Sequence, residues 1–285
     1  NLECFNKNTF WHALCINIPQ NLEKNMFSII RSGLSTANQE ISVVSNNIAN
    51  ANSTGFKKSR ANFEEVFSKI DEQRNGSIAG IGARSEDPKR LHSQGSLKQT
   101  GGALDLAVSG IGLFVLAAAG ENTLNSYTRD GSFQLDRSQT VVTTDGVPLL
   151  GTNNEPIVVP FTLQNSDGST EYLSEVKVAA DGQIKASYAK TKDLNMGQFL
   201  LAKFDDESAL RSVGNNRYIA TDKSGNAQTG AAMTGGFGEV LAGSLEMSNV
   251  DITEELVSLI KAQQSFNGAA RIMQAEIEIA YKFTS

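Results

Sequence analysis

The sequence predicts an α+β protein that is mostly β, with a long helix near each end and a central antiparallel β-rich domain. Three observations predict this class. Apolar residues follow a heptad repeat between about 26 and 56 and again between 252 and 280, and residues 95–247 contain short β-type runs separated by turn residues. Two such repeats at opposite ends predict that the N- and C-terminal long helices form a coiled coil and that the middle forms a separate body.

The first helix is expected from Met26 to about Phe56. Its apolar positions are separated by uninterrupted steps of three and four residues, the pattern of a helix that packs along another helix. These positions are Phe27, Ile30, Leu34, Ala37, Ile41, Val44, Ile48 and Ala51. Asn50, Asn52 and Gly55 then supply residues that tolerate the left-handed conformation common at a helix C-terminus.

Asparagines are concentrated in the last turns of this helix, at Asn46, Asn47, Asn50 and Asn52. Their amides compete with the backbone for hydrogen bonds, so each costs helix stability, ~0.5 kcal/mol against alanine. Capping and fraying explain Asn50 and Asn52. Asn46 and Asn47 avoid the apolar positions, and we interpret them as hydrogen-bonding contacts to another chain.

Residues 1–25 differ in character from the rest of the chain. They hold both cysteines (Cys4 and Cys15) and the single tryptophan, Trp11, and they lack a cleavable signal pattern. We interpret them as a leader that is not native to the protein; the alternative is a real, disordered arm. Without them the chain has no cysteine, so neither a disulfide framework nor thiol chemistry is expected.

The connecting segment, residues 61–94, has a mixed pattern. Ala61–Ile70 has the apolar spacing to continue helically, and glycines at 76, 80 and 82 then interrupt it. The complete predicted division is a leader (1–25), an N-terminal coiled-coil helix (26–60), this irregular segment (61–94), a β-rich body (95–247) and a C-terminal coiled-coil helix (248–285).

Within the body, Asp-Gly pairs mark three turns between β-type runs. This dipeptide between apolar runs is a strong signal for a hairpin. The pairs are Asp130-Gly131, Asp145-Gly146 and Asp181-Gly182. Gly110 and Gly112 similarly precede the apolar run Leu113–Leu116, which predicts a tight turn followed by a strand.

The second helix is expected to begin near Ser248 and Asp251, which are spaced like a capping box, with Glu254 and Glu255 in the first turn where the helix dipole favours negative charge. One polar residue, Gln263, interrupts the apolar repeat and could set its register. The repeat consists of Ile252, Leu256, Leu259, Gln263, Phe266, Ala270, Met273, Ile277 and Ala280.

Composition limits the function classes. A length of 285 residues suggests one to three domains, and the net charge of −6 argues against nucleic acid as a partner, because phosphate binding needs a basic surface. No apolar run approaches 18 residues, so no membrane span is expected.

Catalytic and metal-binding patterns are not recognisable. His12 and His92 are far apart and no metal-ligand spacing accompanies them. Asp105 and Asp130 could form an acid/base pair, but each adjoins a turn in which aspartate is expected for its hydrogen bonds. We therefore expect no enzyme activity, no cofactor and no metal.

Several stretches together resemble the bacterial flagellar hook and basal-body rod axial proteins. Residues 45–57 (SNNIANANSTGFK) resemble the N-terminal signature of that family. Three further stretches agree with it in order, namely 100–114 (TGGALDLAVSGIGLF), 127–133 (YTRDGSF) and 243–257 (GSLEMSNVDITEELV). The chain departs from the family pattern at Leu113, Gln264 and Phe266, where the family usually has phenylalanine, arginine and tyrosine.

The resemblance implies a structural subunit of the rod or hook that self-assembles into a helical tube and transmits torque for motility. Its partners would be further copies of itself, adjacent rod and hook proteins, the flagellar type III export apparatus and a cap or scaffold protein. It would lie in the basal body or hook, and membership of rod or hook stays open. The expected subunit interface comprises Ile30, Leu34, Ile41, Val44, Asn46, Asn47, Ile48, Asn50, Leu256, Leu259, Gln263, Phe266, Met273 and Ile277.

Two alternatives belong to other function classes. A secreted β-rich, adhesin-like protein without a flagellar role would explain the strands and the lack of cysteine, but not the paired terminal repeats. A hydrolase that uses carboxylates would need a cleft, and no motif supports it.

Overall fold

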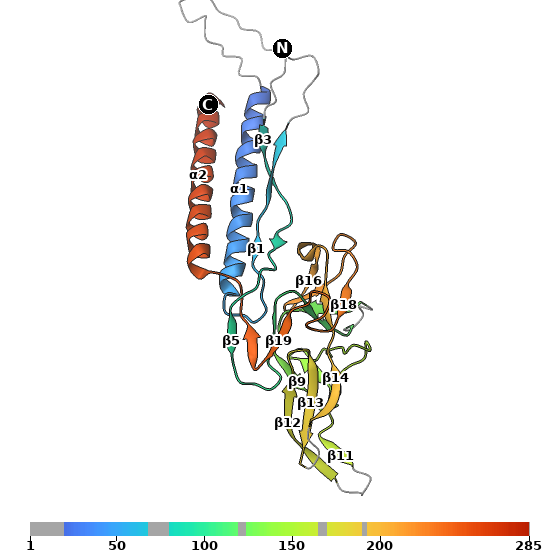
Figure 1. Ribbon diagram of the computed structural model, residues 1–285. Helices are drawn as coiled ribbons and strands as arrows, with labels where there is room; N and C mark the ends of the chain where they lie inside the picture. The colour runs from blue at the N-terminus through green and yellow to red at the C-terminus, as the bar shows by residue number, and fades with distance from the viewer. Residues whose placement is uncertain (1–19, 68–79, 119–123, 165–169, 190–192, 285) are drawn as a thin grey trace, which may run out of the picture. The chain divides into compact units, whose positions relative to one another are not determined.

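The computed structural model describes residues 20–67, 80–118, 124–164, 170–189 and 193–284 (Figure 1). It confirms the mostly-β class with one long helix near each end and a β-rich region between them. Helix α1 spans Gln20–Ala49 and helix α2 spans Ile252–Thr284. Residues 1–19, which make up most of the expected leader, lie outside the described residues.

The strands between the helices are mostly short. They are β1 (Ser59–Arg60), β2 (Phe63–Phe67), β3 (Gly80–Ser85), β4 (Lys89–Arg90), β5 (Leu97–Gln99), β6 (Leu106–Ser109), β7 (Leu113–Leu116), β8 (Ser126–Thr128), β9 (Phe133–Leu135), β10 (Val141–Thr143), β11 (Thr162–Gln164), β12 (Thr170–Val178), β13 (Gln183–Tyr188), β14 (Leu194–Gln198), β15 (Leu201–Lys203), β16 (Arg211–Gly214), β17 (Arg217–Ile219), β18 (Gln228–Gly230), β19 (Glu239–Ala242) and β20 (Ser244–Glu246). One turn of 3₁₀ helix, η1, spans Glu207–Ala209.

The chain forms two compact units. Unit 1 contains the described residues of Asn1–Gln39, Phe63–Glu86 and Lys261–Ser285, so it combines the first part of α1, the strands β2 and β3, and most of α2. Unit 2 contains Glu40–Asn62 and Asp87–Ile260. Within the described residues, neither helix combines the length and the apolarity that crossing a lipid bilayer requires.

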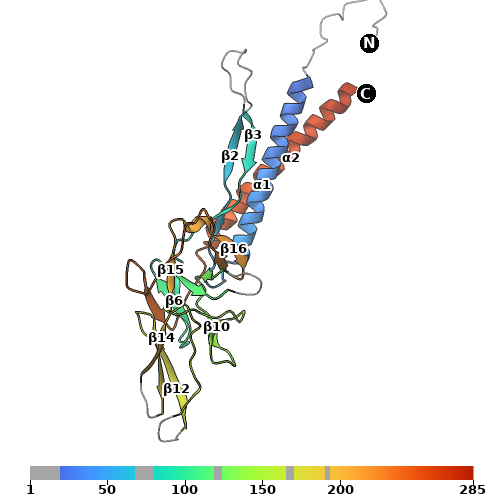
Figure 2. The same cartoon turned by 90° about the vertical axis from the view of Figure 1, so that its right-hand side faces the viewer.

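The expected helical continuation over Ala61–Ile70 is wrong as far as Phe67, and residues 68–70 lie outside the described residues. Phe63–Phe67 instead forms β2, which pairs antiparallel with β3 (Figure 2). The hairpin is held against α1, because the Ala83 amide donates to the Ser32 hydroxyl at 3.3 Å. Partners distant in sequence therefore override a weak local helical spacing.

The core of unit 2 lies on both faces of β7. Its residues alternate between two apolar clusters, since Phe114 and Leu116 belong to one cluster while Leu113 and Val115 belong to the other. β7 is an inner strand of a six-stranded sheet in the order β16-β17-β8-β7-β15-β18. A separate four-stranded sheet runs β11-β12-β13-β14.

The Asp-Gly predictions had different outcomes. Two are confirmed, because β12 and β13 pair across Asp181-Gly182 and the chain folds back across Asp145-Gly146 with Val142 bridged to Pro148. The hairpin at Asp130-Gly131 is wrong. β8 pairs with β7 and β17 and β9 pairs with β10, so this turn links two different sheets.

Candidate functional site

Three charged residues meet in the interior of unit 2. Lys57 follows α1, Arg129 follows β8 and Glu246 ends β20, and at most 3% of each residue's surface is exposed. Lys57 Nζ donates to Glu246 Oε1 at 2.6 Å, and Arg129 Nη1 donates to Glu246 Oε2 at 3.3 Å. We call Lys57, Arg129 and Glu246 the clasp, because it joins the chain that leaves the first helix, the body and the chain that enters the second helix.

Backbone groups complete the hydrogen bonding of the clasp. Lys57 Nζ also donates to the Ser93 carbonyl at 2.8 Å, and Arg129 donates to the carbonyls of Val108 at 3.2 Å and Gly110 at 2.7 Å. Glu246 Oε1 accepts a further bond, from the Gly95 amide at 2.9 Å. Buried charges are tolerated only when they are paired and bonded in this way.

The backbone around the clasp is equally constrained. The Gly55 amide donates to the Glu246 carbonyl at 2.8 Å, so the two chain segments pair directly. Gly55 has a φ of +64°, and a Cβ there would lie 2.4 Å from the Asp130 nitrogen. Only glycine fits this position without displacing the turn that carries Arg129.

A histidine lies beside the clasp without a hydrogen bond. His92 has a side chain that is 6% exposed, and its Nδ1 lies 3.8 Å from Glu207 Oε2. Burial, assisted by the positive charges of Lys57 and Arg129, lowers the pKa of His92 to about 4. Burial also raises the pKa of Glu207 and lowers that of Lys57. His92 is therefore neutral at pH 7.

Asn47 has a role within its own chain. Its amide nitrogen donates to the Ser59 carbonyl at 2.8 Å and to Glu255 Oε2 at 3.0 Å, and its oxygen accepts from the Ser59 amide at 2.9 Å. Asn249 acts similarly, since its oxygen accepts from the Lys58 amide at 2.7 Å. Within unit 2, Asn47 thus joins the end of α1 to the start of α2, and Asn249 joins the segment after α1 to the segment before α2.

The residues expected at the subunit interface are distributed over several degrees of exposure. On α1 and in the turn that follows it at Asn50, two are buried (Val44 and Asn47), one is exposed (Asn46) and five are half-buried (Ile30, Leu34, Ile41, Ile48 and Asn50). On α2, three are exposed (Leu256, Gln263 and Ile277) and three are half-buried (Leu259, Phe266 and Met273).

The least exposed side of α2 is displaced from the expected repeat. It also follows steps of three and four, and it consists of Glu255, Leu259, Ala262, Phe266, Ala269, Met273 and Glu276. The apolar surface of α2 is consequently wider than its covered side, and Leu256 and Ile277 lie on the uncovered part at 46% and 53% exposure. Sequence periodicity identified the apolar surface of α2, but it did not show which side of that surface is covered within the chain.

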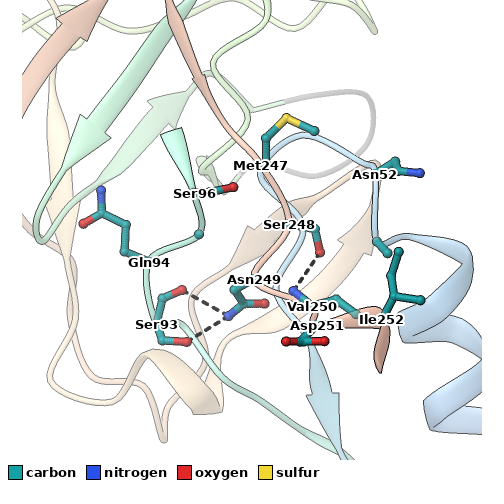
Figure 3. A pocket seen from close by; sticks show the side chains of 12 residues that line it. Asn52, Ser93, Gln94, Ser96, Met247, Ser248, Asn249, Val250, Asp251 and Ile252 are labelled. Carbon is teal, nitrogen blue, oxygen red and sulfur yellow. Dashed lines mark hydrogen bonds between the residues drawn. The ribbon is translucent and has the colours of Figure 1, made fainter. Parts of the chain in front are cut away.

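An open pocket of about 570 Å³ lies at the start of α2 (Figure 3). Its walls come from the segment after α1, the segment before β5 and the segment before α2, with Asn249 bonded to Ser93 across it. Asp251 caps α2 by accepting from the Thr253 amide at 2.8 Å, whereas Ser248 bonds the Val250 amide instead. Among the described residues, no group of three or more acidic, histidine or cysteine side chains could hold a metal ion.

Comparison with known families gives matches in three regions of the chain. Residues 107–186 match the flagellar hook protein FlgE/F/G D1 domain, and residues 241–280 match the C-terminal domain of the flagellar basal body rod FlgEFG proteins. Residues 29–57 match the flagella basal body rod protein family. Each residue of the clasp lies in a different one of these matches: Lys57 in the third, Arg129 in the first and Glu246 in the second.

Similar proteins cover nearly the whole chain. The flagellar basal-body rod protein FlgG of Bacillus subtilis is 33% identical over 261 residues, which are 87% of this chain and 93% of the relative. FlgG of Buchnera aphidicola subsp. Schizaphis graminum is 34% identical over 249 residues, 84% of this chain and 90% of the relative. The flagellar basal-body rod protein FlgF of Caulobacter vibrioides is 29% identical over 245 residues, 86% of this chain and 90% of the relative.

These matches confirm the resemblance on which the functional expectation depends, and they give the adhesin alternative no support. The chain thus belongs to the family of flagellar hook and basal-body rod proteins, the structural axial subunits of the flagellar basal body.

Proposed function

We propose that this chain is a rod-type subunit that polymerises with copies of itself, and next to other axial proteins, into a helical tube that transmits torque. The length and names of its relatives favour the rod over the hook. In this proposal the chain is not an enzyme. Its terminal segments (26–60 and 248–285) contribute the helices α1 and α2 of a coiled coil, and the residues between them in the sequence include a separate body (95–247).

One observation carries the proposal: the part of unit 1 that the structure describes has almost no core of its own. Among its described residues, the fully buried apolar side chains are Ala37 and Ala262, which are both small. Large apolar side chains are exposed instead, namely Met26, Phe27, Ile29, Phe63, Phe67, Ile272, Ile277, Ile279 and Tyr281. So much exposed apolar surface is typical of a subunit that buries it against neighbours.

We further propose that the two helices form a coiled coil. The hydrogen bond between Asn47 and Glu255, 3.0 Å long, fixes their relative register at one end. The interface with other copies would use the uncovered positions, including Asn46, Leu256 and Ile277, while Asn47 serves inside the chain. Because such a contact joins different surfaces and does not close, it generates a filament.

Assembly in the cell would involve further proteins. We propose that the flagellar type III apparatus exports the chain unfolded and that a cap or scaffold protein guides its addition to the growing tube. The support for this step is family membership.

Substitution of an exposed residue on α2 tests polymerisation. Ile277→Asp places a charge on a side chain that is 53% exposed in the single chain, so unit 2 should fold normally while the apolar contact with neighbours is lost. Sedimentation of purified protein should then show wild-type chains in large assemblies and the variant as monomer.

Ile277→Leu is the matched control, because it keeps the apolar surface and should still assemble. Retention of wild-type polymers by Ile277→Asp, with hydrogen exchange showing a folded body, would contradict the proposed use of α2.

A further inference from the structure

We infer that the clasp makes the folding of unit 2 conditional on the arrival of Glu246, so that the body stays unfolded until nearly the whole chain is present. The inference concerns folding of the single chain. It rests on the proposed function only for its purpose, which is to keep an exported subunit from folding before residues 1–246 have left the channel.

Folding depends on Glu246 because this residue comes late in the sequence. Lys57 and Arg129 occur early, and all strands of the six-stranded sheet, from β7 to β18, precede residue 246. A chain that ends before Glu246 therefore already contains both cations and most of the body, but not the carboxylate that accepts a hydrogen bond from each of them.

Without Glu246, the two buried cations would make folding of unit 2 unfavourable. The acceptors left to Lys57 and Arg129 among the described residues would be the carbonyls of Ser93, Val108 and Gly110, and the two like charges would repel each other. Lys57 can lose its proton, but an arginine cannot at any physiological pH. Removal of one partner from a buried ion pair is accordingly far more destabilising than loss of the pair as a whole.

The neighbouring groups do not replace Glu246. Glu207 lies close enough to feel both cations, yet no hydrogen bond joins it to either of them among the described residues, and burial raises its pKa. Uncharged His92 offers no countercharge. Among the described residues, Glu246 is thus the carboxylate that neutralises Lys57 and Arg129.

The test uses the full-length chain with Glu246→Gln, which keeps the shape of the side chain and removes its charge. We expect backbone amides of β7 and β15 to exchange with solvent at least about a hundredfold faster than in the wild type at pH 7, at concentrations where the protein is monomeric. Glu254→Gln is the matched control, because Glu254 pairs with Lys58 at 3.1 Å on the surface, and it should leave these amides unchanged.

A triple variant separates charge from shape. In Lys57→Met/Arg129→Met/Glu246→Leu no charge remains to be buried, so protection of the same amides should return to within about tenfold of the wild type, whether or not Glu246→Gln folds at all.

Wild-type protection in Glu246→Gln would overturn the inference. So would a triple variant that is as unprotected as Glu246→Gln, because the loss would then come from geometry and not from stranded charge. Neither measurement involves polymers, so a failed assembly test with Ile277→Asp would leave this result standing.

Discussion

At the scale of single residues, we expect His92 to make the protein sensitive to acid. Its pKa in the folded chain is about 4, below the ordinary value of 6.5, so between these pH values the unfolded chain binds a proton that the folded chain does not. Stability is therefore retained above pH 6.5 and falls as the pH drops towards 4, by about 2 kcal/mol between pH 7 and pH 5.

Urea unfolding at pH 7 and pH 5 measures this effect. His92→Gln should lose less stability over that interval than the wild type. Glu207 cannot mimic the result, because its raised pKa acts with the opposite sign and penalises the folded chain as the pH rises. An equal loss of stability in the variant would show that His92 is not the titrating group.

The chemistry of the clasp could not be predicted from sequence. Lys57, Arg129 and Glu246 each stand in a stretch that resembles the axial protein family, so their neighbourhoods were identified. Lys57 and Glu246 are 189 positions apart, however, and no local pattern distinguishes a buried lysine from a solvated one. Asn47 was recognised as an unusual helix residue, but its bonds to Ser59 and Glu255 depend equally on distant chain segments.

At the scale of elements, the terminal helices should gain order on assembly. Unit 1 covers few of their apolar side chains, and helices without tertiary packing are marginally stable in water. Circular dichroism should show a helical signal per residue that is lower in monomer than in polymer. A signal that stays constant while the protein sediments as polymer would contradict this expectation.

The sequence predicted elements well where the local signal was strong. Both helices were recognised from their repeats, although α1 runs from Gln20 to Ala49 and the expected helix ran from Met26 to about Phe56. The strand over Phe63–Phe67 was missed because its pairing with β3 lies outside the window of any periodicity. Asp130-Gly131 has the composition of a hairpin turn, but the Leu106 amide bonds to the Gly131 carbonyl at 3.0 Å and the chain crosses between sheets.

At the scale of the whole molecule, the two units should differ in stability. Unit 2 has two buried apolar clusters, whereas unit 1 has small buried residues and exposed large ones. In monomer, amides in the part of α2 after residue 261 should exchange much faster than those of β7, and the difference should shrink in polymer. Uniform protection of monomer along the chain would show that unit 1 is stable alone.

The class of the molecule was predictable, whereas its strand order was not. Recurring turn residues predicted an antiparallel β-rich body between two helices. The six-stranded sheet, however, places β17 beside β8 and β15 beside β7, and these neighbours are distant in sequence. Such pairings depend on which faces bury apolar side chains together, information that a single stretch does not contain.

The clasp also restricts which amino-acid substitutions such a subunit can accept during evolution. Replacement of one clasp residue by an uncharged one leaves buried charge unpaired at the others, so single substitutions of Lys57, Arg129 or Glu246 destabilise the fold. The clasp can be lost without this penalty only when several of its residues are replaced nearly at once. The three positions are therefore expected to change together in evolution, although they are far apart in the sequence.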